Sequence, residues 1–333
     1  MPGLTLLATG GTIAARSRDG VRNTSDGVPG ADVLDRARAV WGFEGEVDVR
    51  DVAGVGSSAL TVPDVLALVE AARAALTRSD GVVITHGTDT MEETAFLLSL
   101  ALGPAPVAVT GSQRAFDDSA PDGPRNLAAA LAWASDRAAA DAGVTVVFAD
   151  LVLPAIGVHK SATLAPEAFT APGRGPIGHV DESGVRRHAV PPVPGPLLEP
   201  GTTDLPRVAL VPQYLGADEA EIDAAVASGA QGLVVATFGS GNTTPAVTSA
   251  LVRLLDRGFP VVMSSRTGSG AVSGLYTGGG ADLIAAGAVP AGDLSPWQAR
   301  LLLAAALAPD RSDHDWATRM RRWLADAGAG PRS

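Results

Sequence analysis

The chain has 333 residues, of which 46% are hydrophobic and 18% are charged, and its formal net charge is -11. These figures predict a globular protein of about two domains, and the negative charge disfavours nucleic acid and anionic membranes, which attract basic surfaces. Because the sequence contains no cysteine, disulfide bonds, a thiolate nucleophile and a cysteine-bound zinc ion are excluded.

The N-terminal residues are predicted to belong to the fold rather than to a targeting segment. An apolar strand is expected to begin at Leu4, and neither a basic region nor a small-residue cleavage site precedes it. No apolar run reaches the roughly 18 residues of a membrane helix. We therefore expect a cytoplasmic protein with no membrane partner.

Short apolar runs alternate with segments of helical period through residues 1–189, which we expect to form one α/β domain. The expected strands are Leu4–Ala8, Val47–Val52, Gly81–Thr85, Pro106–Thr110 and Val144–Phe148. The expected helices are Ala31–Trp41, Val62–Leu76, Met91–Leu102 and Asn126–Ala142. This alternation predicts βαβ units in a large, doubly wound and mostly parallel sheet. The strands are apolar throughout because helices cover both faces of such a sheet.

Residues 190–206 are too rich in proline for a helix or a strand, and we expect them to form a linker. The alternation resumes over 207–333, which predicts a smaller C-terminal α/β domain. Its expected strands are Val208–Val211, Gly232–Ala236 and Pro260–Ser264, and its expected helices are Glu219–Ser228, Pro245–Arg257 and Pro296–Leu307. In a last helix, Trp316, Met320 and Trp323 have the spacing of a packing stripe.

Two threonine-rich turns follow expected strands. One is Ala8-Thr9-Gly10-Gly11-Thr12-Ile13-Ala14, and the other is Thr85-His86-Gly87-Thr88-Asp89-Thr90. In open α/β sheets, ligands bind beyond the carboxyl ends of the strands, so the two turns are able to converge on one ligand. Glycines 10 and 11 allow the backbone to approach that ligand closely. On its residues alone, the first turn is more typical of an ordinary turn or helix cap than of a catalytic site.

The second turn has a partial structural explanation. The run Thr90-Met91-Glu92-Glu93 fits a capping box, with Thr90 as the N-cap and Glu93 reaching back to it. A capping box does not explain Thr88 and Asp89, a hydroxyl and a carboxylate just ahead of the helix. His86 is a further candidate for catalysis, although a strand-end histidine more often has a structural role and no HExxH motif accompanies it.

Lys160 is the only lysine in the chain, and it lies in the segment Ile156–Thr163. A hydroxyl nucleophile needs a base. Lysine is able to serve as one when it is desolvated, whereas arginine keeps its proton. A bias of the composition toward arginine accounts for a single lysine equally well.

Taken together, these segments resemble the bacterial L-asparaginase family over nearly the whole chain. The matching segments are Ala8–Ala14, Gly56–Ser58, His86–Ala95, Val109–Arg114, Ser119–Leu127, the segment around Lys160, Gly239–Asn242 and Ser264–Arg266. The resemblance implies that Thr12 is a nucleophile. It also implies that Thr88, Asp89 and Lys160 form a second cluster that activates Thr12 or a water molecule.

The resemblance further implies which residues hold the substrate. Ser57 is expected to bind the α-carboxylate of an amino acid, and Asp89 its α-ammonium group. Ser58 falls where the family has a glutamine. No cofactor and no metal ion are implied. The family assembly implies a homotetramer, a dimer of dimers with sites between the large domain of one chain and the small domain of another.

Two departures from the family pattern concern loops. Residues 15–30 lack the tyrosine that the family carries near its nucleophile, and Thr267–Gly280 has no clear equivalent of a glutamate supplied by a neighbouring subunit. The second loop contains Tyr276. We expect this phenol to enter a neighbour's site and to replace one of the missing groups, the alternative being that it packs beneath a glycine-rich loop.

We therefore expect the chain to hydrolyse the side-chain amide of L-asparagine to L-aspartate and ammonia through a Thr12 acyl-enzyme. One alternative is the related subunit of the archaeal glutamyl-tRNA amidotransferase, which carries an extra N-terminal domain. This chain starts directly at its first strand. A second alternative is a non-catalytic amino-acid-binding or regulatory protein, which has no use for the whole set of Thr12, Thr88, Asp89 and Lys160. A dinucleotide-binding enzyme is disfavoured because the first turn does not have the GxGxxG pattern of such enzymes.

Overall fold

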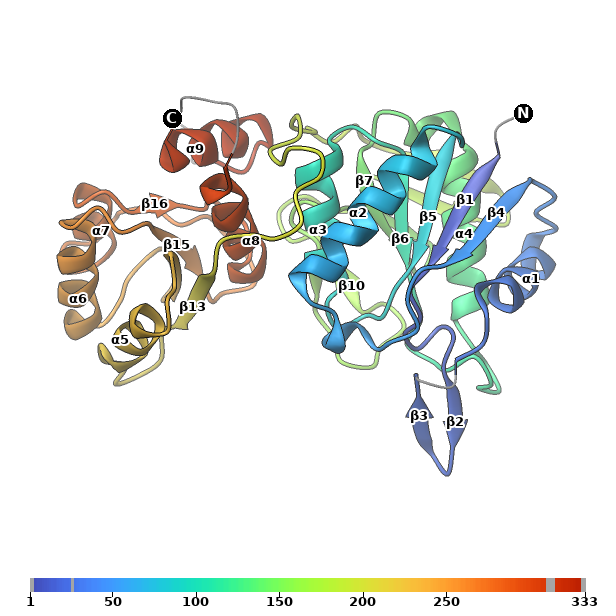
Figure 1. Ribbon diagram of the computed structural model, residues 1–333, viewed down its shortest axis with the longest axis horizontal. Helices are drawn as coiled ribbons and strands as arrows, with labels where there is room; N and C mark the ends of the chain where they lie inside the picture. Colours follow the sequence, from blue (N-terminus) through green and yellow to red (C-terminus); the bar gives the residue numbers. More distant parts are fainter. Residues whose placement is uncertain (1–2, 25–26, 310–314, 331–333) are drawn as a thin grey trace. The chain divides into compact units, whose positions relative to one another are not determined.

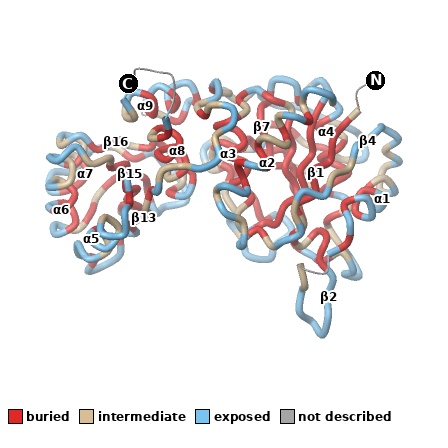
Figure 2. Tube along the Cα trace, viewed as in Figure 1, coloured by how far each residue is buried: buried red, intermediate tan, exposed pale blue. Residues whose placement is uncertain are grey.

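The computed structural model describes residues 3–24, 27–309 and 315–330. It divides the chain into two compact units, Met1–Pro196 and Leu197–Ser333. Each unit has its own sheet with helices packed on it, and the strands of both sheets are largely buried (Figures 1 and 2). The expected fold class, a large and mostly parallel sheet followed by a smaller α/β domain, is confirmed.

An eight-stranded sheet lies at the centre of the first unit, in the order β12-β11-β8-β7-β6-β5-β1-β4. Its strands are β1 (Leu4–Ala8), β4 (Val47–Asp51), β5 (Gly81–Thr85), β6 (Val107–Thr110), β7 (Val144–Phe148), β8 (Leu151–Pro154), β11 (Gly178–Asp181) and β12 (Gly184–Arg187). The five strands from β4 to β7 pair in parallel, as predicted, and β8, β11 and β12 add antiparallel pairs. Sequence patterns missed the last three because β8 follows β7 within one apolar run and β12 is largely exposed.

Helices cover both faces of this sheet. They are α1 (Gly30–Trp41), α2 (Val62–Leu76), α3 (Met91–Leu102) and α4 (Gly123–Ser135), with short 3₁₀ turns η1 (Ser57–Ala59) and η2 (Arg137–Ala139). Leu6 and Val83 belong to the core beneath α1 and α4. Their chain neighbours Leu7 and Ile84 are buried on the other face, because successive side chains of a strand point in opposite directions.

The helix expected over Asn126–Ala142 is placed wrongly, since α4 begins and ends earlier. Pro124 lies in its first turn, where the missing N–H of proline costs nothing. At the other end, Asp136 has extended backbone angles, and its side chain accepts a hydrogen bond from the main-chain N–H of Ala138. Asp136 therefore ends α4 and caps the short turn η2 that follows.

The second unit has a four-stranded parallel sheet in the order β13-β14-β15-β16. Its elements are β13 (Val208–Pro212), β14 (Gly232–Thr237), β15 (Val261–Ser265), β16 (Val289–Pro290), α5 (Ala220–Ala227), α6 (Pro245–Leu255), α7 (Gly280–Ala285), α8 (Pro296–Leu307) and α9 (Trp316–Asp326). The elements α7 and β16 are too short for a periodic pattern and were not predicted. Of the expected packing stripe in α9, Met320 and Trp323 are buried and Trp316 is half-buried.

Two small antiparallel pairs complete the first unit. The hairpin of β2 (Arg16–Arg18) and β3 (Val21–Asn23) is largely exposed and projects away from the main sheet (Figure 1). The strand β9 (His159–Lys160) pairs with β10 (Phe169–Thr170) and carries the single lysine. Within the described ranges 3–24, 27–309 and 315–330, none of the helices has the length and apolar character needed to cross a bilayer.

Candidate active site

Strand pairing brings both threonine turns to one edge of the large sheet. Ala8 of β1 lies opposite Thr85 of β5, and Thr85 lies opposite Thr110 of β6. The main-chain N–H of Thr9 donates to the carbonyl of Thr85 at 3.1 Å, and that of His86 donates to the carbonyl of Thr110 at 2.8 Å. The pairing thus extends one residue past the strands, and the turns leave the sheet side by side.

Glycines allow the two turns to touch. A Cβ on Gly11 would lie 2.6 Å from both the Cα and the N of Gly87, and a Cβ on Gly87 would lie 2.7 Å from the Oγ of Ser57. Gly11 also has a φ of +81°, a conformation that favours glycine. The segments around Thr12, Ser57 and Thr88 are therefore in direct contact. A side chain at position 11 or 87 would prevent this contact.

Thr12 lies half-buried in the first turn, where the N–H of Ala15 donates to its carbonyl at 3.1 Å. Among the described residues, the Thr12 hydroxyl has no hydrogen-bond partner, and the main-chain N–H groups of Thr12 and Thr88 have none either. This edge of the sheet therefore carries a hydroxyl and two main-chain N–H groups that have no partner among the described residues.

Thr88, Asp89 and Lys160 form one hydrogen-bonded cluster. The Lys160 Nζ donates to the Thr88 Oγ1 at 2.8 Å and contacts the Asp89 Oδ1, also at 2.8 Å. The Lys160 side chain is 17% exposed, and that of Asp89 is 66% exposed. The ammonium group is thus largely shielded from solvent, whereas the carboxylate remains open to a ligand.

Glu92 is a residue of this region that sequence patterns did not identify. Its Oε2 accepts a hydrogen bond from the main-chain N–H of Lys160 at 2.6 Å and lies 3.1 Å from the Nδ1 of His159. Glu92 carries a buried carboxylate, and this neighbour raises the pKa of His159 above its usual 6.5. The only sequence indication of such a role was its place beside Asp89 in the first turn of an expected helix.

The capping box predicted at Thr90 is wrong. Thr90 makes no side-chain cap, and its backbone angles of φ -119° and ψ 17° are not those of an extended N-cap. Its hydroxyl instead donates to the carbonyl of Ser57 at 3.0 Å, and its N–H donates to the Ser57 Oγ at 3.4 Å. Thr90 therefore fixes the loop that carries Ser57.

The two serines proposed for substrate binding differ in their surroundings. Ser57 is buried beside Gly87 and Thr90, at the start of η1, whereas Ser58 is exposed. Tyr276, the third proposed contact, belongs to the second unit. It lies in the loop between β15 and α7, and 58% of it is exposed.

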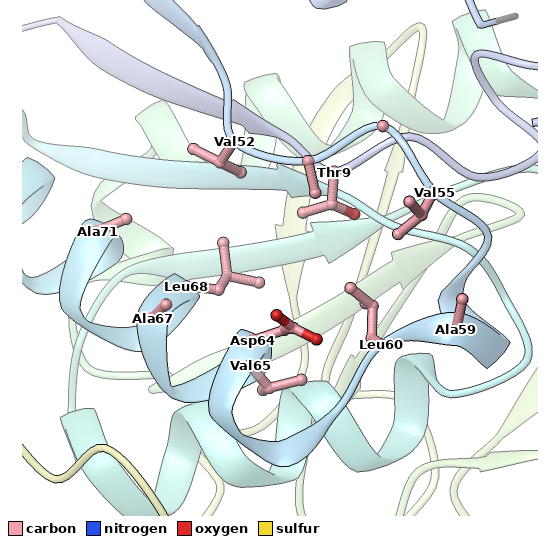
Figure 3. Close-up of a pocket in the computed structure, with 12 residues that line it drawn as sticks. Thr9, Val52, Val55, Ala59, Leu60, Asp64, Val65, Ala67, Leu68 and Ala71 are labelled. Atoms are coloured by element: carbon pink, nitrogen blue, oxygen red, sulfur yellow. The ribbon is translucent and has the colours of Figure 1, made fainter. Parts of the chain in front are cut away.

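A cavity of about 530 Å³ lies between the loop of residues 52–60 and α2 (Figure 3). Its lining is mostly apolar and includes Val55, Leu60 and Leu68, with Thr9 and Asp64 as polar members. None of Thr12, Thr88, Asp89 and Lys160 lines it. This cavity is therefore separate from the cluster of polar side chains.

His86 is fully buried. Its Nδ1 lies 2.7 Å from the carbonyl of Gly87, and because a carbonyl only accepts, the Nδ1 carries the proton. Burial lowers the pKa of His86 to about 4, so the ring is neutral near pH 7. This arrangement fixes the turn before Thr88.

No group of three His, Asp or Glu side chains within the described residues is arranged to hold a metal ion.

Comparison with known protein families covers both units. The family described as Asparaginase, N-terminal matches residues 3–192, and the Glutaminase/Asparaginase C-terminal domain matches residues 207–320. The matched ranges include every residue of the polar cluster.

Individual relatives agree over nearly the full length. The chain is 34% identical to L-asparaginase 2 of Escherichia coli, across 92% of this chain and 89% of that protein. It is 38% identical to a probable L-asparaginase of Deinococcus radiodurans, across 91% and 92%. The crystal structure of a probable cytoplasmic L-asparaginase from Campylobacter jejuni matches with a TM-score of 0.85 at 30% identity, covering 98% and 99% of the two chains. The chain therefore belongs to the asparaginase family.

Proposed function

We propose that this chain is an L-asparaginase that hydrolyses the side-chain amide of L-asparagine to L-aspartate and ammonia. The observation that supports this proposal best is the contact of the Lys160 Nζ with the Thr88 hydroxyl and the Asp89 carboxylate. This cluster lies at the strand edge to which Thr12 also belongs. The names of the relatives in Escherichia coli and Deinococcus radiodurans support the same substrate.

In the first half of the reaction, the Thr12 oxygen attacks the amide carbon. The bond from that carbon to nitrogen breaks, the proton of the Thr12 hydroxyl goes to the leaving nitrogen, and ammonia departs. Thr12 is then esterified by the aspartyl group. The unpaired N–H groups of Thr12 and Thr88 stabilise the negative charge on the amide oxygen, a contribution of roughly 3–4 kcal/mol per donor in other enzymes.

In the second half, water attacks the ester carbon. Thr88 accepts a proton from this water and passes its own hydroxyl proton to Lys160, which acts in this step as a neutral amine. The ester bond breaks, the proton held by Lys160 returns through Thr88 to the Thr12 oxygen, and aspartate leaves. Asp89 keeps the lysine side chain in place during both steps.

Substrate binding uses the groups around the cluster. The open carboxylate of Asp89 receives the α-ammonium group of asparagine, and Ser57 and Ser58 receive its α-carboxylate. Tyr276 of a neighbouring copy reaches this site in a homotetramer, and the protein acts in the cytoplasm. Light scattering tests the assembly, and a stable, fully active monomer would refute a shared site.

A non-catalytic amino-acid-binding protein is the second candidate. Amino-acid binding alone does not require a lysine amine in contact with a threonine hydroxyl. Ammonia release from L-asparagine, L-glutamine and the two D-isomers, measured side by side, separates the candidates. The parent chain should release ammonia from L-asparagine, and Thr12→Ala should not, while it remains folded and still binds aspartate. Turnover retained in Thr12→Ala would transfer the nucleophile to Thr88 or refute the mechanism.

A further inference from the structure

Lys160 is anchored at two points to one short segment of chain. Its Nζ contacts Thr88 and Asp89 at 2.8 Å each. Its main-chain N–H donates to the Glu92 Oε2 at 2.6 Å. The segment 88–92, which opens α3, therefore holds both ends of the lysine: the charged tip of its side chain and the backbone from which that side chain starts.

Glu92 is suited to this second anchor. It is the buried acidic side chain in the first turn of α3, where the helix dipole favours negative charge. A buried carboxylate requires donors or an opposite charge. Both come from β9, as the N–H of Lys160 and the imidazole of His159.

We propose that Glu92 is a positioning residue for Lys160, and that protonated His159 in turn holds Glu92 in place. This inference rests on the proposed function, because positioning matters only if Lys160 relays protons. A lysine side chain is a flexible four-carbon stem, so its tip is placed well only when its base is fixed. A misplacement of about 1 Å in a site of this kind lowers rates about a hundredfold.

The protonation of His159 makes this support depend on pH. The contact of its Nδ1 with the Glu92 carboxylate at 3.1 Å is the largest cause of the raised pKa of His159, and partial burial opposes that shift. The other charged residues on the adjoining segments are Lys160 on the same strand, Asp89 ahead of α3, and Glu167 and Arg174, which precede and follow β10 in the sequence. The ion pair is complete below about pH 6.5 and is lost as pH rises through the raised folded pKa.

The first test is the kinetics of Glu92→Gln with L-asparagine. Its amide still accepts a hydrogen bond but carries no charge for His159. We expect kcat to fall at least about tenfold while KM stays within about twofold, since the groups that bind substrate are untouched. Glu182→Gln, at an exposed glutamate beside Arg125, is the matched control and should keep parental kinetics. A parental kcat in Glu92→Gln, or an equal loss in Glu182→Gln, overturns the proposal.

The second test replaces His159 by glutamine, which is able to donate to Glu92 but does not titrate. The ratio of parental kcat to that of His159→Gln should be at least about threefold higher near pH 5.5 than near pH 8.5, because a charged donor binds a carboxylate more strongly. Groups that titrate in both proteins cancel in this ratio. A ratio that does not change with pH overturns the role of His159.

A third measurement does not depend on catalysis. Titration of His159 by NMR in the parent should give a pKa above 6.5, and in Glu92→Gln a value at or below 6.5, because only burial then acts on the ring. An unchanged His159 pKa refutes the contact between the two residues. A parent that shows this titration but releases no ammonia from asparagine refutes the proposed function and leaves the contact standing.

Discussion

Gly11 lies directly against Gly87, with no room for a methyl group between the two turns. A Cβ on Gly11 would come within 2.6 Å of the backbone of Gly87, a distance that real Cβ atoms essentially never show. The obstacle is main chain rather than the end of a flexible side chain. The contact therefore depends on glycine at this position and couples the turn of Thr12 to the turn of Thr88.

The first prediction concerns this contact. Gly11→Ala should lower the free energy of unfolding by about 3 kcal/mol, from overpacking and from the positive φ, and should abolish ammonia release by separating the turns. Gly42→Ala is the control, because Gly42 has a φ of +68° and nothing lies within 4 Å of a Cβ built there. Urea denaturation of both variants measures the difference. Equal losses in the two would mean that the backbone conformation alone, and not the contact, is responsible.

The second prediction concerns Lys160. Arginine keeps its proton at any usable pH, so Lys160→Arg places a permanent charge beside Asp89 and removes the base. We expect kcat to fall at least about a hundredfold, the lower end of general-base contributions. Lys160→Met should lose at least as much. Activity of Lys160→Arg near the parental level would reduce Lys160 to a structural cation.

The third prediction concerns the pH dependence of stability. Burial lowers the pKa of His86 from 6.5 to about 4, so between these values the unfolded chain binds a proton that the folded chain does not. The folded state should lose about 3 kcal/mol from this residue as pH falls from 6.5 to 4. His86→Gln does not titrate, and its urea denaturation curves should depend less on pH over this range. A slope identical to that of the parent would contradict the prediction.

The fourth prediction concerns Tyr276. If its phenol contacts Thr12 or the substrate ammonium group in a neighbouring copy, Tyr276→Phe should lower kcat/KM without lowering the melting temperature. The chain has one other tyrosine, Tyr214, which is also exposed and whose hydroxyl contacts Glu221. Tyr214→Phe is thus a matched control that should keep parental kinetics. Parental kinetics in Tyr276→Phe as well would remove Tyr276 from the site.

Local patterns predicted the elements that local chemistry determines. The bounds of α2, α3 and α8 and of β1, β5 and β7 agree with the prediction. Thr61 and Asp64 form a true capping box at the start of α2. Such elements are encoded within a few residues, by caps and by the period of their apolar side chains.

Local sequence patterns did not predict contacts between segments that are far apart in the chain. The partner of Glu92 in the main chain is 68 residues away, and nothing near Glu92 in the sequence points to it. The local rule failed at Thr90 for the same reason, since the competing partner is Ser57 in another loop. The resemblance to a family supplied Lys160 and Thr88 as members of one cluster, which neither composition nor spacing could have joined.

The solitary lysine has one more consequence. A protease that cuts only after lysine finds a single peptide bond in this chain, Lys160–Ser161. That bond lies where β9 ends, and the N–H of Ser161 donates to the carbonyl of Ala168 at 2.7 Å. Proteolysis there requires the β9–β10 pair to open. The rate at which two fragments appear on a gel therefore reports how often the β9–β10 pair opens.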